Sequence, residues 1–232
     1  MKRSLLKLSV IALLFASCAK DTTTTETSLK YSFNAINLSS TLSTTASASG
    51  VVVAAGTNGS INWTGVSVNV SKIEFSASHT GTNTAVVVQN FTNVNALKPD
   101  SLSGKIDLKA GVYEKIQFKL TMTESATNPP FILTGTYTEA SGTKIPVIVQ
   151  LNQSKLISLE VARLEVDKGV YIAKVTLELN ALVKGLVASD FGQTTRIGAD
   201  NKIVVNSTTN RALYEKLTAR LSSVAGISIT KQ

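Results

Sequence analysis

Apolar and polar residues alternate through much of the chain from Tyr31 to Leu179. Successive side chains of a strand point to opposite faces of a sheet, so this period of two predicts strands with one buried face. The clearest runs are Ile116–Met122, Phe131–Tyr137 and Ile145–Leu151, and each contains β-branched residues, which favour strands. The middle of the chain is therefore expected to form β-sheet.

Two of the alternating runs change parity halfway. In Val66–Phe75 the apolar positions shift by one residue near Ser71-Lys72, and in Ile157–Val166 they shift near Ala162-Arg163. A shift of one residue turns every later side chain to the other face of the sheet. We therefore expect a β-bulge, which bends a strand, at each of these two places.

Polar segments that contain glycine separate the runs. Residues 79–83, 140–143 and 167–169 each lie between two alternating runs and predict hairpins, and residues 56–59 are a further candidate. The stretch from Ser39 to Ser49, rich in Ser, Thr and Ala, is compatible with either a loop or an edge strand.

The hydrophobic period changes near the end of the chain. Leu213, Leu217 and Leu221 recur every four residues, which predicts an amphipathic helix over residues 209–223 with an N-cap among Ser207–Thr209. A shorter helical turn is expected at 181–189, a hairpin at 196–205 and a last strand at 226–230. The expected fold is thus mainly β: an antiparallel β-sandwich with one C-terminal amphipathic helix.

The N-terminus has the pattern of an export signal. Lys2, Arg3 and Lys7 come before the uncharged run Leu8–Ala16. This run is about nine residues long, whereas a membrane span needs roughly 20. Residues 1–17 are therefore expected to be a signal peptide that is removed.

The signal ends in the segment Phe15-Ala16-Ser17-Cys18, which resembles the lipobox of bacterial lipoproteins, although that family prefers Leu at the position of Phe15. The resemblance implies that Cys18 becomes the lipidated first residue of the mature chain. Cys18 is the single cysteine, so it cannot form an intramolecular disulfide. Two or three acyl chains would hold the protein on a membrane stably.

Residues 18–28 are polar and are expected to form a flexible tether to a single domain, 29–232. By resemblance to lipoprotein sorting rules, Ala19 after the cysteine implies the bacterial outer membrane. The pair Lys20-Asp21 resembles surface-export tags of Bacteroidetes-type lipoproteins. Either the periplasmic or the cell-surface side is compatible with these signals.

The net charge and the single histidine limit the partners and the kinds of site that we expect. The net charge of +8 falls to +5 without the signal, and the basic residues form no run, so no nucleic-acid partner is expected. His79 lies in a predicted turn without a nearby serine elbow, so we interpret it as an exposed turn residue. One histidine and one cysteine do not supply a zinc ligand set, and no cofactor, metal site or enzyme activity is expected.

Few other residues are candidates for a site. Glu160 and Glu165 lie close in sequence, but we interpret them as charges on the solvent face of a strand. Trp63 is a candidate for ligand contact, and a core position is the more common role of a sole tryptophan. Thr22 and Ser101 lie in segments that resemble the O-glycosylation acceptor motif of Bacteroidetes.

The segment Val66–Phe75, followed by Lys109–Ile116, resembles a family of uncharacterised bacterial envelope lipoprotein domains. In that family a strand with alternating valines is followed by an Ala-Gly-x-Tyr turn and a second alternating strand. The resemblance spans about Val66 to Leu179. It implies an immunoglobulin-like or transthyretin-like sandwich and no activity.

These observations lead to one hypothesis and two alternatives. The first is a noncatalytic, lipid-anchored envelope protein that binds a glycan, a protein or another envelope component. The runner-up is a fimbrillin-like adhesin or pilus subunit, in which Ile227 and Ile229 would belong to a strand that completes the sheet of a neighbour. The third, a glycan hydrolase, requires two facing carboxylates.

Overall fold

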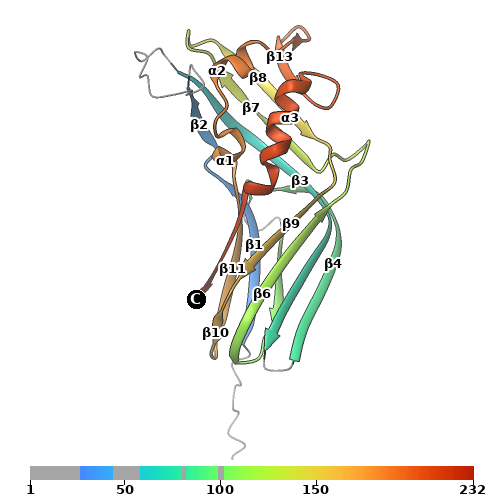
Figure 1. Ribbon diagram of the computed structural model, residues 1–232, viewed down its shortest axis with the longest axis vertical. Coiled ribbons are helices and arrows are strands. Elements are labelled where there is room, and N and C mark those ends of the chain that lie inside the picture. The colour runs from blue at the N-terminus through green and yellow to red at the C-terminus, as the bar shows by residue number, and fades with distance from the viewer. Residues whose placement is uncertain (1–26, 44–57, 80–81, 99–101) are drawn as a thin grey trace, which may run out of the picture.

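The computed structural model describes residues 27–43, 58–79, 82–98 and 102–232. The molecule is elongated, with long strands at one end and three helices packed at the other (Figure 1). About 60% of the described residues are in strands, which confirms the prediction of a mainly β fold. The strands form two sheets.

The smaller sheet has four strands in the order β14-β11-β1-β5. β1 is parallel to β11, whereas β1 with β5 and β11 with β14 are antiparallel. The strands are β1 Ser28–Ile36, β5 Ser103–Asp107, β11 Val170–Glu178 and β14 Ala225–Lys231.

The larger sheet has ten strands in the order β10-β6-β3-β7-β8-β13-β12, with β2 and β4 also on β3, and β9 also on β6. β13 is parallel to β8, so both sheets are mixed and the prediction of purely antiparallel sheets is wrong. Both parallel pairs join segments far apart in the sequence, because parallel neighbours need a long crossover connection. The strands are β2 Ser39–Leu42, β3 Gly59–His79, β4 Thr82–Asn95, β6 Gly111–Met122, β7 Phe131–Thr138, β8 Lys144–Leu151, β9 Lys155–Val161, β10 Leu164–Val166, β12 Arg196–Ile197 and β13 Lys202–Val205.

The two sheets pack face to face through aromatic side chains. Tyr31 of the smaller sheet meets Phe118 of the larger one edge-on, with ring centroids 6.3 Å apart. Phe118 in turn meets Phe75 of β3 at 5.0 Å. The inward positions of the three clearest alternating runs are buried, as predicted, apart from the half-buried Gly135.

β3 is 21 residues long and extends through both halves of the molecule. Its first half pairs with β2 and β7, and its second half pairs with β4 and β6. The register with β4 shifts between Val68 and Val70, about two residues before the predicted bulge, and the extra residue lies on β4. Near Ala162-Arg163 the chain has a break between β9 and β10, and both strands pair with β6.

Two of the three predicted hairpins are confirmed. β3 and β4 pair from His79 and Thr82 onward, and β7 and β8 pair from Thr138 and Lys144 onward. The predicted hairpin at 167–169 is wrong, because β10 belongs to the larger sheet and β11 to the smaller one. Those residues carry the chain from one sheet to the other. Most of the candidate turn at 56–59 lies outside the described residues.

The C-terminal elements follow the prediction closely. The hairpin of β12 and β13 and the last strand, β14, are both present. The helices are α1 Leu179–Val183, α2 Ala188–Gly192 and α3 Arg211–Arg220, and α3 continues into the 3-10 turn η1 Leu221–Ser223. The leucines that recur every four residues, Leu213, Leu217 and Leu221, are buried, so the predicted amphipathic helix is confirmed.

The predicted N-cap of this helix is wrong. Asn210 occupies the position with a left-handed backbone (φ 52°), and it makes no side-chain cap hydrogen bond. The backbone N–H groups of Thr208 and Thr209 donate to Asn206 Oδ1, at 3.0 and 2.7 Å. The Asn206 side chain thus accepts hydrogen bonds from the backbone amides of this segment. The Ser207–Thr209 segment therefore forms a turn before the helix.

Candidate functional site

A groove lies between β2 and the helical segment that starts with α1. Its volume is about 630 Å³, and we call it the polar groove. Hydroxyl, amide, carboxylate and ammonium groups dominate its walls. The lining residues are Ser39, Ser40, Thr41, Ser43, Glu178, Asn180, Ala181, Val183, Lys184, Gly185 and Leu186.

Two sets of contacts hold the walls of the polar groove in place. On one side, Leu42 is buried in the core, and the backbone N–H of Ala188 donates to the Ser43 carbonyl at 2.8 Å. On the other side, Arg220 of α3 donates from Nε to the Lys184 carbonyl at 2.7 Å and from Nη1 to the Lys216 carbonyl at 2.7 Å. Both walls are thus tied to the helices that cover this end of the molecule.

The hydrogen-bonding groups of the groove are partly unused. Ser40 Oγ is shielded from solvent and has no hydrogen-bond partner among the described residues. A buried polar group without a partner costs free energy. Glu178 and Lys184 are exposed, and neither forms an ion pair within the described part of the chain. The groove therefore presents donors and acceptors of both charges to a polar ligand.

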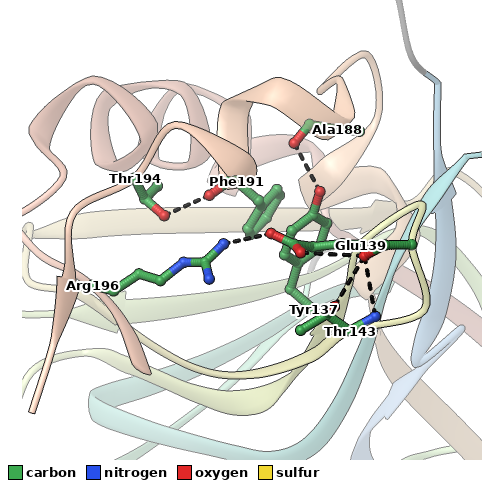
Figure 2. A network of polar contacts seen from close by, with 8 residues as sticks. Tyr137, Glu139, Thr143, Ala188, Phe191, Thr194 and Arg196 are labelled. Carbon is green, nitrogen blue, oxygen red and sulfur yellow. Dashed lines mark hydrogen bonds and ion pairs between the residues drawn. The ribbon is translucent and has the colours of Figure 1, made fainter. Parts of the chain in front are cut away.

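Beneath α2, an aromatic pair supports the same end of the molecule (Figure 2). Tyr137 and Phe191 stack with centroids 5.2 Å apart, and Tyr137 Oη donates to the Ala188 carbonyl at 3.0 Å. Burial raises the pKa of Tyr137, and the nearby carboxylate of Glu139 raises it further, so the hydroxyl stays a donor at neutral pH. Glu139 itself forms an ion pair with Arg196.

Three further grooves are smaller. One, of about 340 Å³, lies between α2 and α3 and contains the pair Asp190–Lys216, 2.5 Å apart. The second, of about 490 Å³, lies beside Tyr31, and the third, of about 230 Å³, lies beside Asn69 and Phe91. None of these four grooves contains more than one carboxylate, whereas paired-carboxylate glycoside hydrolysis needs two.

The structure places the sequence candidates away from the polar groove. Trp63 is 1% exposed in the core, and its Nε1 has no hydrogen-bond partner among the described residues. His79 packs against Tyr113 with ring centroids 5.0 Å apart. Glu160 pairs with Lys115 at 2.6 Å, and Glu165 is exposed. Within the described residues no three His, Cys, Asp or Glu side chains form a group that could hold a metal ion.

Other candidates concern the ends of the chain. Cys18, Thr22 and Ser101 lie outside the described residues. Ile227 and Ile229 of β14 pair with β11 of the same chain, opposite Val175 and Ala173. Among the described helices, none has the length and apolar character required to cross a membrane.

Sequence reasoning missed the polar groove. Part of one wall, Ser39–Ser43, lies in the low-complexity stretch that was compatible with either a loop or an edge strand. Its Ser and Thr content was a signal for hydroxyl groups, but only the pairing of β2 with β3 shows that they line a groove beside α1. No family model, curated protein or solved structure matches the chain.

Proposed function

We propose that this chain is a noncatalytic, lipid-anchored protein of the bacterial outer membrane, and that its polar groove binds a glycan or another hydroxyl-rich envelope component. The observation that carries the proposal is the polar lining of the groove, in which short hydroxyl and amide side chains lie beside the exposed charged groups of Glu178 and Lys184. Sugars offer dense arrays of hydroxyl donors and acceptors, which match such a wall.

The composition of the groove supports the same ligand class. Ser39, Thr41 and Asn180 line the groove with short polar side chains, and Ser39 Oγ is already oriented by a 2.6 Å hydrogen bond to Asn62. Few side chains in the groove need to lose rotamer freedom on binding, because Ser, Thr and Asn are short. Lys184 and Glu178 would add charge-assisted hydrogen bonds to a sugar that carries ionic groups.

The position at which β1 begins supports a lipid anchor that lies far from the polar groove. β1 begins beside the connection between β10 and β11, where Ser28 N donates to the Gly169 carbonyl at 3.1 Å. This is the end of the molecule away from the helices (Figure 1). A lipid on Cys18 would therefore hold the domain by one end, and the groove would face away from the membrane.

The finer fold type belongs to the same proposal. The two facing sheets are compatible with the immunoglobulin-like or transthyretin-like sandwich that the resemblance to envelope lipoprotein domains implies. The parallel pair of β1 with β11 is the feature that any assignment to one of these types has to accommodate.

Binding measurements test the groove. Oligosaccharides released from bacterial envelope polysaccharide should bind the purified protein in calorimetry. The double variant Thr41→Ala, Lys184→Met, at two exposed lining residues, should weaken that binding at least about tenfold, which corresponds to the loss of roughly 1.4 kcal/mol. The matched control is Lys144→Met, an exposed lysine on β8 outside the groove, which should bind as the unchanged protein does. Equal affinities in both variants would refute the site.

Labelling tests the anchor separately. The protein should incorporate radioactive palmitate and fractionate with the outer membrane when expressed in a bacterial host. Cys18→Ser should lose the label and leave the membrane fraction. A Cys18→Ser protein that stays labelled and membrane-bound would contradict the lipid anchor but would leave the groove proposal intact.

A further inference from the structure

The outer margin of the larger sheet is a long strand that pairs on one side only. β4 spans 14 residues, and β3 is its single strand partner within the described part of the chain. It forms the free edge beside the long β3 strand in Figure 1. A free edge leaves a row of backbone N–H and C=O groups able to pair with another strand.

β4 lacks the devices that usually protect such an edge. No Lys, Arg, Asp, Glu or Pro lies between His79 and Lys98. The other edge strands in the described part of the chain have seven residues or fewer: β5, for example, carries Lys105 and Asp107, and β12 has two residues, one of them Arg196. Charges and short length are the common means of blocking edge-to-edge association. Among the described strands, β4 is thus the longest edge without a charged residue.

The bulge in β4 defines the part of the strand that can pair. Asn93 adopts a left-handed backbone (φ 53°), and the register with β3 shifts at this point. From Thr82 to Phe91 the strand runs as one segment without a register shift, and ten residues of strand are roughly 33 Å long. Val86 and Val88, opposite Phe75 and Ile73, lie half-buried on the inner face.

We propose that β4 pairs with β4 of a second copy of this chain, antiparallel around a twofold axis, so that the two larger sheets join into one. The absence of charged residues on β4 favours a second copy as the partner. In an antiparallel pair around a twofold axis, a residue on the axis faces its own copy, and every other residue faces the residue equally far on the other side of the axis. Charges of one sign on such a strand would therefore meet across the pair, which destabilises it. An uncharged strand is free of this repulsion. A strand that recruits a different protein has no such constraint and gains specificity from charges.

The alternation of hydrogen bonds identifies a residue that tests the pairing. His79 and Thr82 pair across a two-residue connection, the arrangement in which the flanking residues form the first hydrogen-bonded pair. Counting along the register, Ser76 and Ala85 form a pair without hydrogen bonds between them, so the Ala85 N–H points away from β3. Ala85 is also exposed. Proline at this position removes an outward donor and leaves the β3–β4 ladder intact, as edge strands tolerate.

Sedimentation of the purified full chain carrying Cys18→Ser tests the proposal, because this background removes the thiol and with it disulfide-linked dimers. The mass should rise with concentration from 24.5 kDa to twice that value and no further. In the same background Ala85→Pro should raise the dissociation constant of the dimer at least about tenfold, and Ala85→Ser, which keeps the N–H, should leave it unchanged.

Three results would overturn the pairing: a monomer at every concentration, a dimer that Ala85→Pro does not weaken, or open-ended assemblies larger than a dimer. Circular dichroism and thermal unfolding of Ala85→Pro establish that the monomer is folded. If that variant is unfolded, Ala85→Lys takes its place, because it keeps the backbone donor and adds a charge to both copies. A dimer that Ala85→Lys leaves at full strength in low salt would equally refute the proposal.

Discussion

The side chain of Asn69 joins three segments of the chain at the bend of β3. Its Oδ1 accepts a hydrogen bond from the backbone N–H of Asn93 at 2.7 Å, and its Nδ2 donates to the Pro129 carbonyl at 2.7 Å. The backbone N–H of Asn69 also donates to the Pro130 carbonyl at 2.9 Å. Asn69 is 8% exposed, so these bonds are largely shielded from water. This side chain holds the bulge of β4 against β3.

Replacement of Asn69 should therefore destabilise the fold. Asn69→Ala leaves the Asn93 N–H and the Pro129 carbonyl without their side-chain partner, and the loss of each such hydrogen bond costs about 0.5–1.5 kcal/mol. Urea unfolding should show a loss in this range or larger. Asn180→Ala, at an exposed position of α1, is the matched control and should change the unfolding free energy by less than about 0.5 kcal/mol. Equal losses in the two variants would contradict the role of Asn69.

The parity change near Asn69 shows which features of the fold the sequence pattern can predict and which it cannot. Local alternation correctly predicted the buried faces of β6, β7 and β8, because burial of one face imposes a period of two within each strand. The same pattern does not reveal which strand carries the extra residue of a bulge. Here that residue lies on β4, and an interaction between positions 24 residues apart fixes it.

The sequence pattern could not predict the pairing between distant segments for the same reason. The turn residues at 167–169 correctly mark a change of chain direction, but the partners of β10 and β11 are β6 and β1, which are distant in sequence. The polar groove depends likewise on β2 and α1, separated by more than a hundred residues. Local patterns identify elements, and non-local packing assembles the site.

The stacked ring of Phe191 should be the main anchor of α2. Phe191 is fully buried against Tyr137, and truncation of a buried phenylalanine costs about 3–5 kcal/mol through lost burial and the cavity left behind. Phe191→Ala should lower stability by that amount and speed amide exchange in α2. Leu156→Ala, at a side chain 55% exposed, is the control and should be close to neutral. A loss below about 1 kcal/mol at Phe191 would show that α2 is held by other contacts.

Gly135 should tolerate no side chain. A Cβ at this position would lie 2.3 Å from the Asn62 carbonyl oxygen and 3.0 Å from the Trp63 Cα, both of them backbone atoms of β3. Gly135→Ala would have to push the two strands apart, and overpacking of this kind costs about 1–3 kcal/mol. Gly192→Ala is the control, because its Cβ would meet only the Tyr137 Oη at 3.9 Å. Thermal unfolding that ranks the two variants in the opposite order would exclude this steric explanation.

The ion pair of Asp167 with Lys231 ties the end of β14 to the connection between the sheets. The two groups lie 2.6 Å apart, and Tyr171 Oη also donates to Asp167 at 2.5 Å. The hydrogen bond from Lys231, followed by the one from Tyr171, lowers the pKa of Asp167 below its ordinary 3.8. The hydrogen bond to Asp167 raises the pKa of Lys231 above its ordinary 10.5.

The stabilisation by this pair should therefore depend on pH at both extremes. A carboxyl whose pKa is lower in the folded state stabilises the fold above its unfolded pKa, and the contribution disappears as the pH falls through the folded pKa. An ammonium whose pKa is raised stabilises the fold below its unfolded pKa, and that contribution disappears as the pH rises through the folded pKa. The pair should contribute fully between roughly pH 5 and pH 9. The contribution should be small, because both groups are exposed.

Unfolding curves of Asp167→Asn, Lys231→Met and the double variant would measure this contribution. Each single variant should be less stable than the unchanged chain at pH 7, and the double variant should lose little more than either, since the two share one interaction. The difference between Asp167→Asn and the unchanged chain should shrink on acidification below pH 3.8, the ordinary pKa of the carboxyl, because protonation removes the charge that the variant lacks. Strictly additive losses, or a difference that grows in acid, would show that Asp167 and Lys231 act independently of each other.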